Sequence, residues 1–242
     1  MFYPSEDTQL YLRNHAHLCR QGRYYVIMDL RHDLYLCIER FEFEALTRWL
    51  AGWQASGTNA SLHAVQPDSD PRQLARQLID RGILSESSAA GRPVQPLALE
   101  RPHRELRGTP GGGKLDLSKA PSFACSALRA HILLKHSNIE KTVRSVERSK
   151  LAASPSGPLE EDRIVRLVHG FNALRSLFPR NYLCLFDSLA LLLYLFRQGV
   201  FPSWVFGVMA DPFAAHCWLQ TGDLVLNDSL ERVSHYTPIM AV

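Results

Sequence analysis

Three residues in the last quarter of the sequence carry side chains that together can perform nucleophilic catalysis. Cys184 begins an apolar run, His216 lies in the segment Pro-Phe-Ala-Ala-His-Cys-Trp, and Asp228 follows an asparagine. A cysteine attacks a carbonyl carbon as a thiolate, and a neighbouring base takes up its proton. An acid beside the histidine fixes its tautomer and stabilises its charge. These residue types predict acyl-transfer chemistry at a Cys-His-Asp triad.

Cys184 is expected in the first turn of a buried helix. Residues 183–196 are apolar almost all round, which is typical of a helix at the centre of a domain. Gly199 and Pro202 would stop this helix, and Asn181 is a possible N-cap. The free N–H groups and the dipole of a helix N-terminus favour a thiolate. The alternative is that Cys184 is a small buried apolar side chain, the commonest role of a free cysteine.

His216 and Asp228 are expected on paired strands. The strand-like segments, rich in Val, Trp, Phe and Leu, are Trp204–Met209, Ala215–Gln220 and Leu224–Asp228. A three-residue loop at 221–223 would pair His216 with Asp228 on one face, whereas a two-residue loop would place Asp228 beside Cys217. The same alternation turns Cys217 away from His216, which predicts a packing residue and not the nucleophile.

The order Cys, His, Asp is that of papain-like and transglutaminase-like enzymes. Residues 182–242 closely resemble the B proteins of lasso-peptide biosynthesis: a cysteine opens a helix, followed by Gly-Val (207–208), Pro-Phe-x-x-His-x-Trp (212–218) and Asn-Asp (227–228). The resemblance implies a transglutaminase-like cysteine peptidase that removes the leader of a ribosomally made precursor. It implies Cys184 as nucleophile, His216 as general base and acid, and Asp228 as the orienting acid. The backbone N–H of Cys184 is a candidate oxyanion donor.

Chain length and composition predict two domains. With 242 residues the chain is long enough for two small domains, and 46% hydrophobic residues can fill their cores. The Pro/Gly-rich segment 87–121 reads as a linker between a domain at 1–86 and a peptidase domain at 122–242. The predicted fold class is α+β: a small winged-helix-like N-terminal domain and a peptidase domain whose central helix packs on an antiparallel sheet.

The N-terminal segment has strands followed by helices. Strand-like segments Tyr24–Asp29 and Asp33–Ile38 flank a turn, and helices are predicted at Phe41–Trp53 and from Pro71 to Gly82. This order resembles the PqqD-like precursor-recognition domain. The resemblance implies that the leader adds as a strand in a groove between 33–38 and 74–81. The implied peptide-binding residues are Leu34, Tyr35, Leu36, Cys37, Leu74 and Leu78. The alternative is that Leu74 and Leu78 are core residues.

Several other functions find little support in the sequence. A net charge of +3 is too mild to argue for nucleic-acid binding, and Arg72, Arg76 and Arg81 are too few for a recognition helix. His15, His17 and Cys19 would share a strand face, but no second cluster completes a metal shell. The phosphate-loop spacing of 108–114 follows no buried strand and lacks the hydroxyl after its lysine, so it reads as linker.

The remaining expectations concern the cellular setting and partners. Five cysteines without regular spacing suggest a reducing compartment, and no signal peptide or membrane-length apolar run is present, so a soluble, cytoplasmic protein is expected. The basic stretch Lys141–Lys150 is expected on the solvated face of a helix spanning about 123–149, with Leu128 and Ile132 among its apolar residues.

The implied partners are the leader of the precursor peptide and a cyclase that uses ATP; no cofactor or metal is expected. Two other functions stay open, namely a transglutaminase-type acyl transferase and a catalytically silent precursor-binding chaperone.

Overall fold

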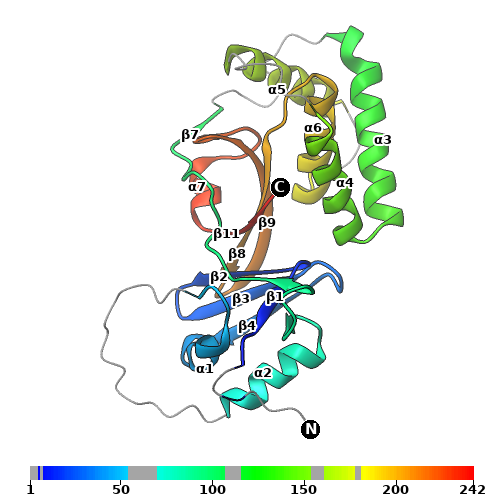
Figure 1. The fold of residues 1–242 in the computed structure, drawn as a ribbon. Helices are drawn as coiled ribbons and strands as arrows, with labels where there is room; N and C mark the ends of the chain where they lie inside the picture. The colour runs from blue at the N-terminus through cyan, green and yellow to red at the C-terminus, as the bar shows by residue number, and fades with distance from the viewer. Residues whose placement is uncertain (1–4, 6–7, 54–69, 107–115, 154–160, 178–180) are drawn as a thin grey trace. The chain divides into compact units, whose positions relative to one another are not determined.

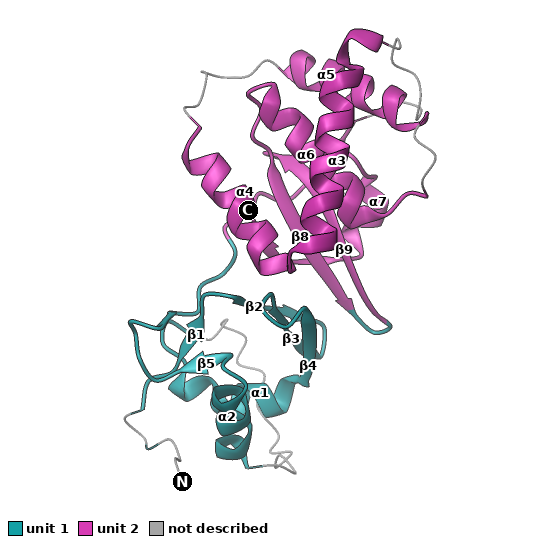
Figure 2. Cartoon of the chain, turned by 90° about the vertical axis from the view of Figure 1, so that its right-hand side faces the viewer, with its two compact units in different colours: residues 1–97, 210–212 teal, residues 98–209, 213–242 magenta. Residues whose placement is uncertain are grey.

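The computed structural model describes residues 5, 8–53, 70–106, 116–153, 161–177 and 181–242 (Figure 1). The chain forms two compact units, which Figure 2 colours separately. Unit 1 comprises residues 1–97 with 210–212, and unit 2 comprises residues 98–209 with 213–242.

Both units contain strands and helices. In unit 1 they are β1 (Tyr11–Arg13), β2 (Ala16–Gln21), β3 (Tyr24–Asp29), β4 (Leu34–Glu39), α1 (Arg40–Leu46), the 3-10 helix η1 (Thr47–Trp49), α2 (Pro71–Asp80), β5 (Leu84–Ser85) and β6 (Gly91–Arg92). Those of unit 2 are β7 (Arg104–Glu105), the 3-10 helix η2 (Leu117–Lys119), α3 (Ala120–His136), α4 (Ile139–Leu151), α5 (Glu161–Arg175), α6 (Cys184–Arg197), β8 (Ser203–Ala210), β9 (Phe213–Thr221), β10 (Leu224–Val225), α7 (Leu230–Ser234) and β11 (Thr237–Ala241).

Unit 1 contains two three-stranded antiparallel sheets, ordered β2-β3-β4 and β5-β1-β6. The turn between β3 and β4 is held by Asp29, whose Oδ1 accepts hydrogen bonds from the backbone N–H groups of Arg31 and His32 at 2.9 and 3.2 Å. Asp33 then adopts a left-handed φ of 52°, which an aspartate tolerates better than most residues. The predicted strand pair and its turn are therefore present.

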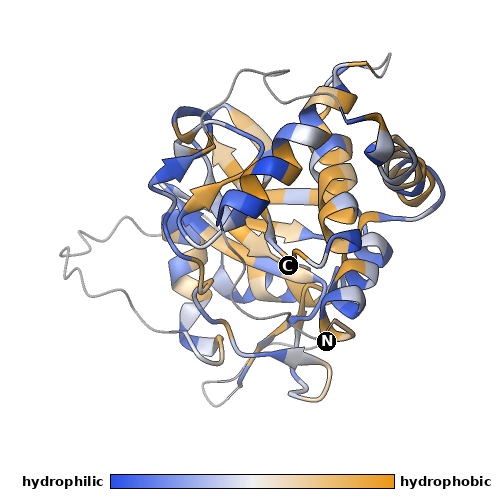
Figure 3. Ribbon diagram, turned by 90° about the horizontal axis from the view of Figure 1, so that it is seen from above, coloured by the Kyte–Doolittle hydropathy of each residue, from blue (hydrophilic) through white to orange (hydrophobic). Residues whose placement is uncertain are grey.

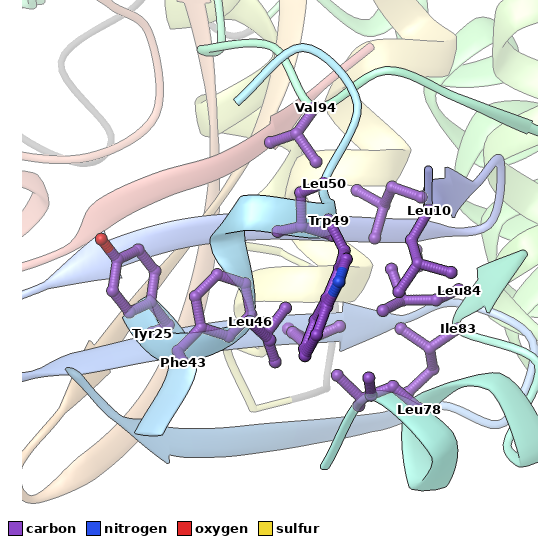
Figure 4. Packing of buried hydrophobic residues seen from close by; sticks show 14 of the residues in the cluster. Leu10, Tyr25, Phe43, Leu46, Trp49, Leu50, Leu78, Ile83, Leu84 and Val94 are labelled. Atoms are coloured by element: carbon purple, nitrogen blue, oxygen red, sulfur yellow. The ribbon is translucent and has the colours of Figure 1, made fainter. Parts of the chain in front are cut away.

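The core of unit 1 lies between these sheets and helices (Figure 4). Tyr25 stacks on Phe43 with ring centroids 4.4 Å apart, so α1 is anchored to β3. α2 begins at Pro71 behind the N-cap Asp70, whose carboxylate accepts from the N–H of Arg72, as expected for a proline in the first turn. The predicted helix over 41–53 is shorter than expected, because α1 ends at Leu46 and η1 continues the chain.

The sheet of unit 2 has five strands in the order β11-β8-β9-β10-β7. All neighbours are antiparallel except β7, which pairs with β10 in parallel. The sheet is therefore mixed, whereas the sequence predicted an antiparallel one. The parallel edge strand comes from residues 104–105, inside the segment that was predicted to be a linker. Likewise β6, at residues 91–92, pairs with β1 in unit 1. The segment 87–121 thus contributes one strand to each unit.

α6 packs between the sheet and another helix. It contacts β9 on one side and α3 and α5 on others (Figure 1). Nine of its fourteen residues are buried, in agreement with the predicted central helix. Unlike α6, the helix α4 has one buried face, with Ile139, Val143 and Val146 at helical spacing. Figure 3 shows helices that carry both apolar and polar residues.

The prediction of a single helix over 123–149 is wrong, because the helix is interrupted at Ser137 and Asn138. Ser137 is extended, and the Asn138 side chain accepts from the N–H of Lys141 at 3.0 Å, which caps a new helix. Leu128 and Ile132 are exposed rather than part of the apolar face, since α3 buries smaller residues such as Ala127 and Ala130.

Candidate active site

Cys184 is the first residue of α6, as the sequence predicts, and its side chain is exposed. The N-cap is Leu183, not Asn181. Leu183 has no polar side chain, and its own N–H donates to Asp187 Oδ2 at 2.6 Å, so a carboxylate one turn into the helix fixes the helix start. The N–H groups at the start of an α-helix lack an intrahelical acceptor, and together with the helix dipole they favour a thiolate or an oxyanion at this position.

A buried arginine holds the backbone that precedes Cys184. Arg175, only 2% exposed, donates from Nε to Asp187 Oδ1 at 2.5 Å and from Nη2 to the carbonyl of Asn181 at 3.2 Å. Its guanidinium also lies 4.3 Å from the ring centroid of Tyr182. The role of Arg175 could not be predicted from the sequence, since no spacing signal marks an arginine nine positions before Cys184 as a residue that holds the start of the helix.

His216 lies on β9 and is buried between two aromatic rings. Its ring centroid is 5.1 Å from that of Tyr236 and 6.1 Å from that of Trp218. Nε2 contacts Asp228 Oδ2, and the other carboxylate oxygen accepts from the N–H of Ser229 at 2.8 Å. Cys184 also hydrogen-bonds the imidazole. Because Nε2 faces Asp228, Nδ1 is the ring nitrogen that remains for the cysteine.

The contacts shift the pKa values of the cysteine and histidine in opposite directions. Hydrogen bonds from Cys217 and His216 lower the pKa of Cys184 to about 4, although burial opposes them. Burial alone would lower the pKa of His216, but the hydrogen bonds to Asp228 and Cys184 outweigh it and raise that pKa to about 9. Between these values the pair exists as thiolate and imidazolium, which is the reactive form of a catalytic cysteine.

Asp228 stays ionised beside the histidine. Burial raises its pKa, but the hydrogen bonds from His216 and the Ser229 N–H outweigh this effect, and the pKa of Asp228 is lowered overall. At neutral pH the carboxylate is therefore negative beside a positive imidazole. Such a charge pair stabilises the imidazolium that forms when a nucleophile gives up its proton.

The route by which Asp228 reaches His216 differs from the predicted strand pairing. Leu224 pairs with Thr221, so the loop holds two residues, and strict pairing would place Asp228 opposite Cys217. However, the ladder ends after Leu226, whose N–H donates to the carbonyl of Leu219 at 2.9 Å. The Leu219 N–H then bonds the side chain of Asn227, at 2.7 Å from Oδ1, instead of a backbone carbonyl. Because the Asn227 side chain takes the place of a backbone acceptor, the strand pairing ends here, and the Asp228 side chain contacts His216.

Cys217 is buried, as a packing residue is, but it also contacts Cys184, which the sequence did not predict. The Cys217 backbone N–H and side chain both hydrogen-bond Cys184. Its Sγ lies 3.3 Å from Ser188 Oγ, which accepts from the Trp204 indole N–H at 2.9 Å. The hydrogen bond with Cys184 and burial raise the pKa of the Cys217 thiol well above its usual range. Cys217 is therefore a neutral donor to the Cys184 sulfur. The alternation of side chains along a strand could not predict this contact, because it gives no information on α6, the helix that packs on β9.

One more residue near the histidine has a role that its geometry explains. Gly207 lies on β8, where a Cβ would come within 2.8 Å of the Trp218 ring and 2.9 Å of Tyr236 Cβ. Only glycine leaves room for these two aromatic side chains, which flank His216. The Gly-Val dipeptide of the sequence motif thus serves the packing of the base.

The residues predicted to bind a peptide in unit 1 occupy different environments. Leu34 and Cys37 on β4 are exposed, and Tyr35 and Leu36 are half-buried. Leu74 on α2 is half-buried, whereas Leu78 is 2% exposed within the core and has no surface for a peptide. α1 contacts both β4 and α2, so the two walls of the predicted groove are joined through α1.

The sequence contains two other patterns that resemble binding sites, the phosphate-loop-like segment and the cluster around His15. The phosphate-loop-like segment 108–114 lies outside the described residues. His15 and Asp29 are buried and approach each other at 3.8 Å, where Asp29 serves the β3–β4 turn. No group of three or more potential metal ligands occurs among the residues that the structure describes. No helix in the described part of the chain has the length and apolarity needed to cross a membrane.

Comparison with known proteins gives a match only to a family model, over the part of the chain that contains Cys184, His216 and Asp228. No curated protein and no solved structure gives a significant match to the chain. Residues 127–241 match the model of the transglutaminase-like superfamily, Transglut_core3. The match begins within α3, ends at the last residue of β11 and includes Cys184, His216 and Asp228. This part of unit 2 is similar to the transglutaminase-like superfamily, which is associated with cysteine-peptidase or acyl-transferase activity.

Proposed function

We propose that this protein is a cysteine peptidase that removes the leader from a ribosomally made lasso precursor peptide. One observation carries the proposal: Cys184, at the start of α6, hydrogen-bonds His216, whose other ring nitrogen contacts Asp228. An exposed nucleophile, a buried base and a paired acid are the parts that a thiol peptidase needs. A lasso precursor is proposed as the substrate because residues 182–242 resemble the lasso B proteins in their sequence motifs.

In the proposed reaction Cys184 acts as nucleophile and His216 as the proton carrier. The thiolate attacks the carbonyl carbon of the last leader residue and forms a tetrahedral oxyanion, for which the Cys184 N–H is a donor at the helix N-terminus. The imidazolium gives its proton to the leaving amine, which frees the core peptide and leaves the leader as a thioester on Cys184. His216 then takes a proton from water, the hydroxide attacks the thioester, and the leader leaves as a carboxylic acid.

Unit 1 is proposed to recognise the leader through β4. This strand pairs only with β3 among the described strands, so its outer edge can accept an added strand. Leu34, Tyr35, Leu36 and Cys37 on β4 and Leu74 on α2 are the proposed contacts; Leu78 supports them from the core. An ATP-dependent cyclase is the proposed partner that closes the ring on the released core peptide.

The decisive experiment incubates the purified protein with the precursor peptide encoded beside its gene and determines the product masses. The proposal predicts two fragments, with a free carboxylate on the leader, and no cleavage by Cys184→Ala. The matched control is Cys125→Ala, since Cys125 is an exposed cysteine on α3 of the same unit. It should cleave normally.

The same reaction mixture separates the two alternative functions. Adding a small primary amine would give a leader amide in place of the acid if the thioester is passed to amines, as in a transglutaminase. Intact precursor with wild-type protein, combined with alkylation of Cys184 that rises about tenfold per pH unit as for an ordinary thiol, would indicate a silent peptide-binding protein and refute the peptidase.

A further inference from the structure

Two cysteines from different elements meet at the nucleophile. Cys184 opens α6 and is exposed, whereas Cys217 is on β9 and is 3% exposed. The side chain of Cys217 hydrogen-bonds the Cys184 sulfur, and the Cys217 backbone N–H does so too. Ser188, whose Oγ is 3.3 Å from Cys217 Sγ, is one helical turn after Cys184 on the same face of α6, so this contact places Cys217 beside the nucleophile. Peptide cleavage requires one thiol, and this site holds two thiols in contact.

The other cysteines of the chain lack such an arrangement. Cys19 and Cys37 both lie opposite Val26, one on each neighbouring strand, so β3 separates them. Two strand spacings amount to about 10 Å, which exceeds the roughly 7 Å limit between the Cα atoms of a disulfide. Cys125 is exposed on α3, where Arg197 is its hydrogen-bond partner at 3.6 Å.

We propose that Cys184 and Cys217 form a reversible disulfide when a hydroperoxide reaches the site, so that the pair is an oxidation switch on the nucleophile. The Cys184 thiolate attacks the terminal oxygen of the hydroperoxide, the O–O bond breaks, and Cys184 becomes a sulfenic acid. The leaving oxygen takes the proton of the His216 imidazolium and departs as water, or as an alcohol when the hydroperoxide is organic. The sulfur of Cys217 then attacks the sulfenic sulfur. An S–S bond forms, the S–O bond breaks, and the oxygen leaves as water with the Cys217 proton.

Accessibility fixes the order of these two steps. A peroxide can reach the exposed Cys184 but not the buried Cys217, so the first oxidation falls on Cys184. The partner thiol is already in contact, and the sulfurs need only close from a hydrogen bond to a bond of about 2 Å. His216, which hydrogen-bonds Cys184, gives its proton to the leaving oxygen in the first step and is then the neutral base available to take the Cys217 proton.

The disulfide would have two consequences for the site. It removes the nucleophile, which switches off the proposed peptidase; this consequence rests on the proposed function. It also protects Cys184, because a sulfenic acid that meets a thiol does not proceed to the irreversible sulfinic and sulfonic acids.

The test oxidises the full-length protein with hydrogen peroxide and maps its cysteines by mass spectrometry before and after dithiothreitol. The expected wild-type product has lost about 2 Da, contains a cross-linked pair of peptides with Cys184 and Cys217, and regains full iodoacetamide labelling of Cys184 on reduction. In Cys217→Ser, Cys184 should gain about 32 Da as sulfinic acid and stay unlabelled after reduction. The control Cys125→Ser should behave as wild type.

A wild-type protein that accumulates sulfinic acid as fast as Cys217→Ser would overturn the proposal, and so would a disulfide of Cys184 with any other cysteine. The wild-type peptide map decides the matter even if Cys217→Ser does not fold. None of these readouts uses precursor cleavage. A protein that forms the disulfide but cuts no precursor would therefore refute the peptidase alone, and one that cuts but forms no disulfide would refute the switch alone.

Discussion

The charge state of Cys184 can be measured through the pH dependence of its alkylation. Hydrogen bonds from Cys217 and His216 lower the pKa of this thiol to about 4 from an ordinary value of 9.0. The folded protein should therefore carry a thiolate at every pH above about 5. Unfolding in urea removes both hydrogen bonds and should return the thiol to ordinary behaviour.

The expected rates follow from the thiolate fraction and from its intrinsic reactivity. At pH 6 an ordinary thiol is about 0.1% ionised and Cys184 almost fully so, a gain of about 1000-fold. A thiolate whose pKa is about 5 units lower is, however, about 100 to 300 times less nucleophilic, for a Brønsted coefficient of 0.4–0.5. Folded Cys184 should thus react about 3 to 10 times faster than unfolded Cys184 at pH 6, and roughly 10 to 30 times slower at pH 8.

The assay measures iodoacetamide incorporation into the Cys184 peptide between pH 5 and 8, with and without urea. The folded profile should stay flat within about twofold, and the unfolded one should rise about tenfold per pH unit. Replacing Cys217 by alanine removes the first of the two side-chain hydrogen bonds, so the folded profile should regain a slope at low pH. A folded wild-type profile that rises tenfold per unit between pH 6 and 8 would show an ordinary thiol and refute the proposed ion pair.

Three further predictions concern the base, the packing around it and the division into units. Precursor cleavage should lose most of its rate in His216→Ala and less in Asp228→Asn, since an amide can still orient the ring; full activity of His216→Ala would exclude this base. Gly207→Ala should lower the unfolding free energy by about 1–3 kcal/mol in denaturant titrations because its Cβ meets two aromatic side chains, and unchanged stability would contradict that contact. A fragment of residues 1–97 should bind labelled leader by fluorescence anisotropy better than 1–86, which lacks β6; equal binding would show that β6 is dispensable.

Much of unit 1 follows from local sequence signals. The strand Tyr24–Asp29 has the predicted limits, and α2 begins at Pro71 and ends just before Gly82, which has a left-handed φ of 68°. These limits are set by residues next to each other in the chain. The helix break at Ser137 and Asn138 is also local, although the apolar spacing over about 123–149 predicted one helix that runs through this polar pair.

Contacts between distant segments were harder to predict. The strand at 104–105 has no strand-like pattern of its own, and it forms because β10 offers an open edge 120 positions later, where Leu224 pairs with Arg104. Arg104 then ties the two together, since its guanidinium binds Asp223 at 2.8 Å. The proline and glycine content correctly predicts a segment with few regular elements. It cannot predict which sheet a short strand of that segment will pair with.

The His216–Asp228 contact shows where counting along a hairpin stops being informative. Residue pairing specifies a face only while backbone groups keep bonding to each other, and the last such bond here joins Leu226 to Leu219. Beyond it the Asn227 amide takes the place of a carbonyl, so the direction of the chain is set by a side chain. The predicted dyad is present although the predicted loop length is wrong, because Asn227 compensates for the one-residue difference. Asn227 therefore belongs to the machinery that positions the acid, and an asparagine directly before a candidate catalytic aspartate is a signal that sequence reasoning can use.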